Sequence, residues 1–130
     1  MGGPRRLRPV ILCVDDHQTG LDVRKRLLEK AGYRVLTAIS AHRALEVFRE
    51  KHPDLVLAEH VAPACIDGPA LAATMKMLKP AVPVVVYSAD LVWPEDMRSA
   101  DTFITKVVST DELLRTIERL LHTGLTVAAS

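Results

Sequence analysis

The stretch Ile11-Leu12-Cys13-Val14-Asp15-Asp16 passes from four apolar side chains directly to two carboxylates. A short apolar run that contains β-branched residues and stops at polar ones predicts a buried β-strand. Runs of the same kind occur three more times, and each also stops at a polar side chain. They comprise residues 55–58 before Glu59, 84–87 before Ser88, and 103–105 before Lys106. The chain therefore contains several buried strands that end at residues able to do chemistry.

Longer amphipathic segments separate the apolar runs, which is typical of βα units around a parallel sheet. We expect strands at residues 9–14, 33–37, 54–58, 84–87 and 102–105, and helices at 21–31, 41–52, 68–78 and 109–123. Gly32 is placed to end the first helix, and Ser40 to cap the second. Ser109 and Glu112 form a capping-box pattern at the last helix, which Gly124 is expected to end. Pro94 leaves room for only a short or irregular fourth helix. With that helix included, the sequence predicts five βα units.

The composition indicates one domain over residues 1–130, with a core over about 8–123 and flexible ends at 1–7 and 124–130. A net charge of +1 argues against bulk attraction to nucleic acid. The two cysteines show no metal or redox spacing. No apolar stretch is long enough to span a bilayer or to act as a signal peptide. We therefore expect a cytoplasmic protein with no direct nucleic-acid or membrane partner.

The polar strand ends predict a shared site. In an open parallel sheet the carboxyl ends of the strands lie at one edge, and ligands bind outside that edge. Asp15, Asp16, Glu59, Ser88 and Lys106 should therefore converge. Three carboxylates supply the oxygen ligands that Mg²⁺ prefers, and adjacent carboxylates repel unless a cation lies between them. A lysine and a hydroxyl can hold an oxyanion such as a phosphoryl group.

This pattern resembles the receiver domain of bacterial two-component response regulators, over residues 8–122. The matching features are Asp15-Asp16, the segment 53–57 before an acidic residue, Pro63 with Asp67-Gly68, Ser88-Ala89 and Thr105-Lys106. The resemblance implies a flavodoxin-like three-layer αβα sandwich with a five-stranded parallel sheet in the order 2-1-3-4-5. It also implies that a histidine kinase phosphorylates a carboxylate at the end of the third strand.

The resemblance further implies roles for individual residues. Mg²⁺ would be held by Asp15, Asp16, Glu59 and the backbone carbonyl of Val61. Ser88 and Lys106 would contact the phosphoryl group, and the aromatic Phe103 would rearrange with it. Family members form dimers and bind effectors through the fourth helix, the fifth strand and the last helix, which are residues 90–100, 102–105 and 109–123 here.

The chain departs from this family at the phospho-acceptor, where Glu59 replaces the usual aspartate. The additional methylene moves the carboxylate by ~1.5 Å, and misplacement by about 1 Å can cost ~100-fold in rate. Glu59 can also pair with Lys106 and Ser88 instead of binding a metal. Val107 replaces the usual proline after the lysine, so we expect a trans peptide bond there.

These departures favour a degenerate receiver, or pseudo-receiver, that is not an enzyme and acts through protein–protein contact. Its partners would be a histidine kinase, a downstream effector or a second copy of the chain, and any Mg²⁺ binding would be weak. The alternative is a receiver in which Glu59 still accepts a phosphoryl group from a histidine kinase with Mg²⁺ as template. An unrelated α/β enzyme or a flavin binder ranks last, because the sequence lacks Gly-rich phosphate loops and a nucleophile elbow.

Two further features of the sequence each allow two interpretations. His17 and His60 flank site residues, and for both a surface histidine is favoured over a ligand. The apolar cluster 91–93 either packs on the core or forms part of an interface.

Overall fold

The computed structural model describes residues 8–60, 68–88, 101–105 and 109–129. These residues form one five-stranded sheet in the order β2-β1-β3-β4-β5, and every strand pair is parallel. The strands are β1 (Val10–Val14), β2 (Arg34–Ala38), β3 (Leu55–His60), β4 (Val84–Ser88) and β5 (Thr102–Thr105). The predicted strand order and parallel pairing are confirmed.

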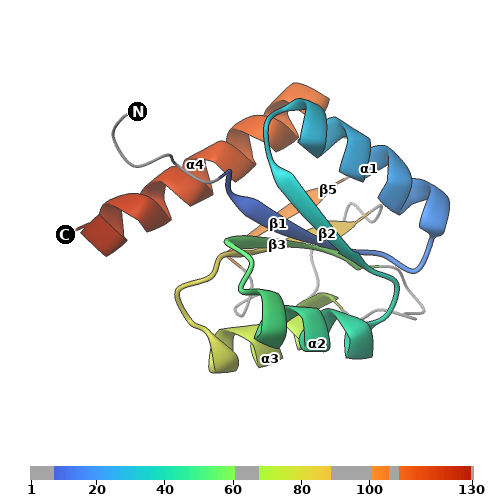
Figure 1. Cartoon of the computed structure of the whole chain (residues 1–130), viewed down its shortest axis with the longest axis horizontal. Coiled ribbons are helices and arrows are strands. Elements are labelled where there is room, and N and C mark those ends of the chain that lie inside the picture. The colour runs from blue at the N-terminus through green and yellow to red at the C-terminus, as the bar shows by residue number, and fades with distance from the viewer. Residues whose placement is uncertain (1–7, 61–67, 89–100, 106–108, 130) are drawn as a thin grey trace.

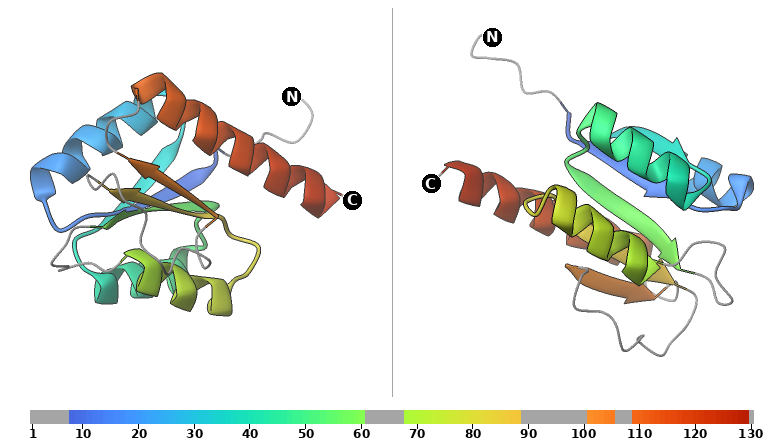
Figure 2. Two further views of the ribbon diagram at one scale, coloured as in Figure 1. Left: turned by 180° about the vertical axis from the view of Figure 1, so that it is seen from behind. Right: turned by 90° about the horizontal axis from the view of Figure 1, so that it is seen from below.

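Within the described residues, four helices cover the two faces of this sheet. They are α1 (Gln18–Lys30), α2 (Ala41–Lys51), α3 (Gly68–Leu78) and α4 (Thr110–Ala129). Helices α1 and α4 lie on one face and α2 and α3 on the other, which gives the predicted three layers (Figures 1 and 2). The short helix expected between β4 and β5 falls on residues 89–100, outside the described residues.

Alternation along the strands divides the core into two clusters, one under each helical layer. On β1, Ile11 and Cys13 pack with α1 and α4, whereas Leu12 and Val14 pack with α2 and α3. On β3, Leu55 and Leu57 face the α1 side in the same way. Strands that are buried on both faces read as continuous apolar runs. This is why the sequence marked them so clearly.

The helix ends follow local rules. Gly32 has a φ of +105°, and its N–H donates to the Glu29 carbonyl while the Tyr33 N–H donates to the Leu28 carbonyl. These two bonds form a Schellman motif that ends α1, as the glycine predicted. The hydroxyls of Ser40 and Ser109 accept hydrogen bonds from Arg43 N and Glu112 N at 3.1 Å each. Both predicted N-caps are confirmed.

Several predicted boundaries are wrong, among them the start of α1, which begins at Gln18 and not at residue 21. Helix α4 continues to Ala129, past the end expected at Gly124 and into the segment 124–130 that was expected to be flexible. Glycine inside a helix costs only about 1 kcal/mol relative to alanine, and the residues that follow do not oppose helix formation. Strand β3 extends two residues beyond the expected end at Ala58, so Glu59 and His60 belong to the ladder.

Two aspartates fasten the amino ends of neighbouring strands. Asp54, just before β3, accepts a hydrogen bond from Val10 N at 2.7 Å and donates its own N–H to the Val10 carbonyl. Asp101, just before β5, makes the same pair of bonds with Val84, at 2.7 and 2.8 Å. This repeated motif was not predicted from the sequence, and it lies at the sheet edge opposite the carboxylates of the predicted site.

Candidate functional site at the carboxyl edge of the sheet

Asp15 and Glu59 lie side by side at the carboxyl edge of the sheet. The β1–β3 register pairs Val14 with Ala58, so the next residue of each strand is one of these two acids. Both continue the alternation toward the α1 face, where Cys13 and Leu57 pack, and both are buried. Two adjacent buried carboxylates repel each other and lose hydration, so a nearby cation stabilises this arrangement.

The guanidinium of Arg24 provides that cation. Arg24 Nη2 bonds to Asp15 Oδ2 and lies 3.8 Å from Glu59 Oε2. The arginine belongs to the stripe of α1 that faces the sheet, between the fully buried Leu21 and Leu28. Its side chain is only 12% exposed, and its guanidinium carbon lies 5.4 Å from the centre of the Tyr87 ring. An arginine buried against two carboxylates and an aromatic ring forms a charge cluster inside the domain.

This role of Arg24 was not predicted from the sequence. A signal was present, because a charged residue at helical spacing between Leu21 and Leu28 occupies a position that should face the sheet. The spacing does not identify the residue that receives the charge. That depends on where α1 packs across the ends of β1 and β3.

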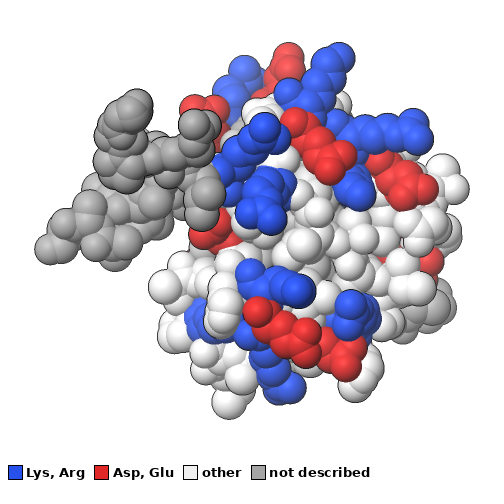
Figure 3. All heavy atoms as spheres, viewed as in Figure 1, with Lys and Arg blue, Asp and Glu red and all other residues white. Residues whose placement is uncertain are grey.

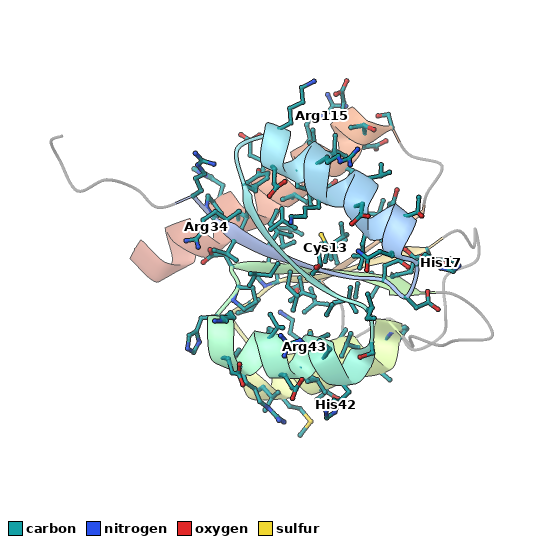
Figure 4. The ribbon with its side chains drawn as sticks, turned by 45° about the vertical axis from the view of Figure 1, so that its right-hand side comes forward. Cys13, His17, Arg34, His42, Arg43 and Arg115 are labelled. Carbon is teal, nitrogen blue, oxygen red and sulfur yellow. The ribbon has the colours of Figure 1, made fainter. Side chains whose placement is uncertain are left out.

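His17 lies at the mouth of the site. Its backbone N–H donates to Asp15 Oδ1 at 2.9 Å, and its ring Nδ1 lies 2.9 Å from Asp16 Oδ1. The imidazole is 74% exposed, which agrees with the expectation of a surface histidine. Figure 4 shows His17 at this edge, Cys13 in the interior and Arg34 near the opposite end of the sheet.

The other predicted site residues are placed differently. Ser88 is buried at the end of β4, where the register sets it beside His60, while Glu59 pairs with Tyr87. Because side chains alternate, Glu59 leaves the sheet on the α1 face and Ser88 on the α2–α3 face. Val61 and Lys106, together with Val107 and the cluster 91–93, lie outside the described residues. Phe103 belongs to β5, but its side chain is not described.

The charge cluster also affects its neighbour Cys13. Burial raises the pKa of the Cys13 thiol to about 12, while the Arg24 guanidinium lowers this pKa and the Asp15 carboxylate raises it. The thiol is fully buried. It therefore stays protonated at neutral pH and is a packing residue, as expected for an idle cysteine.

The residue types at this edge suit Mg²⁺, but the contacts that they already make do not leave them available to it. Asp15, Asp16 and Glu59 supply oxygen ligands of the kind that Mg²⁺ prefers, and Asp15, Asp16 and His17 have ligand atoms within 4.8 Å of one another. However, Asp15 Oδ2 is bound to Arg24, and Asp15 Oδ1 accepts the His17 N–H. The arrangement therefore does not fit a metal, because a guanidinium is already bound to Asp15 and lies 3.8 Å from Glu59.

Two other surface features lie away from this edge. A depression of about 460 Å³ at the amino ends of β1 and β2 is lined by residues that include Arg8, Tyr33, Arg34 and Lys51. It contains none of the residues of the predicted site.

On the face seen in Figure 3, Lys and Arg alternate with Asp and Glu over α1 and α2, which agrees with the small net charge. Of the helices in the described ranges, none has the length and apolar character needed to cross a membrane.

Comparisons with known proteins agree with this architecture. Residues 11–118 match the family described as the response regulator receiver domain. The chain is 37% identical over 123 residues to the transcriptional regulatory protein ZraR of Salmonella typhimurium, covering 91% of this chain and 28% of that protein. It is 32% identical over 120 residues to protein PilH of Pseudomonas aeruginosa, covering 85% of this chain and 96% of that protein. The chain thus spans about a quarter of ZraR but nearly all of PilH.

Among solved structures, the response regulator protein TrrA of Thermotoga maritima in complex with Mg²⁺ and BeF is similar. It superposes with a TM-score of 0.80 and is 26% identical, and the match covers 86% of this chain and 98% of TrrA. That protein therefore holds Mg²⁺ within the same fold.

Proposed function

The chain belongs to the response regulator receiver domain family, and from this premise we propose that it is a pseudo-receiver that signals by protein–protein contact without aspartyl phosphorylation. Receivers act in two-component signalling, where their role is to change which proteins they bind. The observation that carries the proposal is the buried Glu59 carboxylate at the acceptor position, 3.8 Å from Arg24.

Three features of the site support this proposal. Glutamate places its carboxylate ~1.5 Å further along than aspartate would, by the length of one carbon–carbon bond. An attacking carboxylate must also reach a phosphoryl donor, and the side chain of Glu59 is only 1% exposed. The adjacent guanidinium stabilises Glu59 in its present position. Each feature lowers the rate of attack on a phosphoryl group.

The partners follow from the family role. We propose a histidine kinase or a downstream effector as the protein partner, and β5 with α4 as the described part of a face that could form a homodimer. Weak Mg²⁺ binding is part of the same proposal, because Arg24 competes for the carboxylates. Light scattering across a range of protein concentrations would test the homodimer, and a monomer at every concentration would exclude it.

The decisive experiment is incubation with Mg²⁺ and acetyl phosphate, followed by intact-mass spectrometry. We expect no gain of a phosphoryl group by the wild-type protein under conditions that label a receiver with an aspartate acceptor. A stoichiometric phosphoryl group mapped to Glu59 would overturn the proposal and would support the phosphorylatable alternative.

A further inference from the structure

We infer that Arg24 is the resident cation of the acidic edge and takes the place of a divalent metal there. The inference rests on the proposed function only in treating this edge as the regulatory site of the domain. It concerns what neutralises Asp15 and Glu59, and it predicts that the wild-type protein keeps its native site without Mg²⁺.

The guanidinium of Arg24 occupies the position between the two acids. Asp15 and Glu59 occupy adjacent strand ends on the α1 face, and Arg24 contacts the first and lies 3.8 Å from the second. A metal bridging the same two acids would need the same space, because its ligand oxygens would be these carboxylate oxygens. The guanidinium and the metal therefore exclude each other.

The surrounding residues accommodate the Arg24 side chain. It lies between Leu21 and Leu28, which anchor α1 on the sheet, and its guanidinium stacks near the Tyr87 ring. Gly20 leaves room for the ion pair, since a Cβ there would lie 3.1 Å from Asp15 Oδ2 and 3.4 Å from Arg24 Nη2. The arginine is thus packed inside the domain, in contrast to a surface charge that could easily turn into solvent.

Both carboxylate oxygens of Asp15 already accept hydrogen bonds. Its two carboxylate oxygens accept from Arg24 and from the His17 N–H, so both already have donors. Mg²⁺ loses its hydration water reluctantly and demands near-octahedral geometry. To enter, it would have to displace a guanidinium that is already bound to Asp15 and lies 3.8 Å from Glu59. Metal binding at this pair should therefore be far weaker than the three acidic residues suggest.

The inference is tested by removing Arg24 and measuring the response to a metal. We compare wild type, R24Q and the matched control R26Q, since Arg26 is an exposed residue two positions away on α1. Thermal unfolding is followed in MgCl₂ and in NaCl at equal ionic strength, so that screening alone is subtracted. A ligand that binds only the folded state raises the melting temperature.

We expect Mg²⁺ to raise the melting temperature of R24Q but not of wild type or R26Q, beyond the effect of NaCl. Calorimetric titration should show that R24Q binds Mg²⁺ at least about tenfold more tightly than wild type does. The double variant D15N/R24Q should lose this gain, because the metal would lack its buried ligand. Equal Mg²⁺ affinity for wild type and R24Q would overturn the inference.

If R24Q does not fold in the absence of metal, refolding in MgCl₂ gives the same answer, since recovery of the fold by Mg²⁺ but not by NaCl supports the inference. Failure in both salts leaves the wild-type titration as the test, and tight Mg²⁺ binding by wild type overturns the inference. The phosphorylation assay separates the two proposals. Tight Mg²⁺ binding by wild type without phosphorylation removes the resident-cation inference and the expectation of weak Mg²⁺ binding but leaves the pseudo-receiver proposal, whereas phosphorylation of Glu59 removes the pseudo-receiver proposal.

Discussion

Arg24 lies 3.8 Å from Glu59 across the boundary between α1 and β3, with Asp15 bonded to the same guanidinium nitrogen. This relationship links a helix position that should be apolar to the two strand ends that define the site. It places a positive charge beside two buried carboxylates, and the predictions for Arg24 and Glu59 follow from that contact.

Replacing Arg24 by methionine should destabilise the fold strongly. The variant R24M keeps an apolar stem of similar length but leaves Asp15 and Glu59 buried without their cation. Breaking a buried ion pair from one side costs about 3–5 kcal/mol. Urea denaturation followed by circular dichroism measures this loss, and R26M serves as the exposed control on α1. The double variant R24M/E59Q should recover part of the stability, and a loss in R24M no larger than that in R26M would contradict the ion-pair description.

Restoring the acceptor should require two changes. E59D shortens the side chain to that of the usual acceptor, but Arg24 still pairs with Asp15 and opposes metal entry. We expect slow labelling of E59D by acetyl phosphate and Mg²⁺, and faster labelling of E59D/R24Q. Intact-mass time courses for the two variants provide the comparison. Faster labelling of E59D with Arg24 present would show that the arginine does not obstruct the chemistry.

Cys13 should make stability depend on pH in the alkaline range. Burial raises the pKa of this thiol from 9.0 to about 12 in the folded protein. Between these values the unfolded chain loses the proton and the folded chain keeps it, so the unfolded state binds fewer protons and stability falls as pH rises. The contribution is complete below pH 9 and decreases by about 1 kcal/mol per pH unit above it.

The control for this prediction is C13A, which should be less stable at every pH because it leaves a cavity. Its free energy of unfolding should nevertheless fall less steeply between pH 9 and pH 10.5 than that of wild type. Parallel slopes in urea denaturation would disprove a raised thiol pKa. Native wild type should also resist alkylation of Cys13 at pH 8, and urea should remove this protection.

Asp54 and Asp101, which bond the amino ends of neighbouring strands, should contribute different amounts to the free energy of unfolding. Asp101 Oδ2 accepts from Val84 N at 2.7 Å and from Lys76 Nζ at 2.6 Å, whereas Asp54 accepts only the corresponding Val10 N–H among the bonds of the described residues. D101A should lower stability by about 1–3 kcal/mol, the cost of leaving buried or charged donors unsatisfied. D54A, which affects an exposed bond, should cost less. Equal losses in urea denaturation would show that Lys76 adds nothing to the contribution of Asp101.

The sequence predicted the fold because its signals are local. Gly32, Ser40 and Ser109 each fix a helix end through backbone geometry or a cap within a few residues, and the structure confirms all three. Gly124 misled the prediction, since glycine permits a helix end but does not require one. The end of β3 was predicted too early, because the ladder with β4 continues through Glu59 despite its charge.

The sequence by itself determined that Asp15 and Glu59 lie near the carboxyl ends of buried strands, because the apolar runs mark the strands and the parallel-sheet rule puts such ends at one edge. Only the tertiary structure decided what balances their charge and which face each side chain takes. The ion pair of Arg24 depends on how α1 packs across β1 and β3. Glu59 and Ser88 take opposite faces of the sheet because Glu59 pairs with Tyr87, one residue before Ser88. Both are set by contacts between distant segments, and composition and spacing do not encode these contacts.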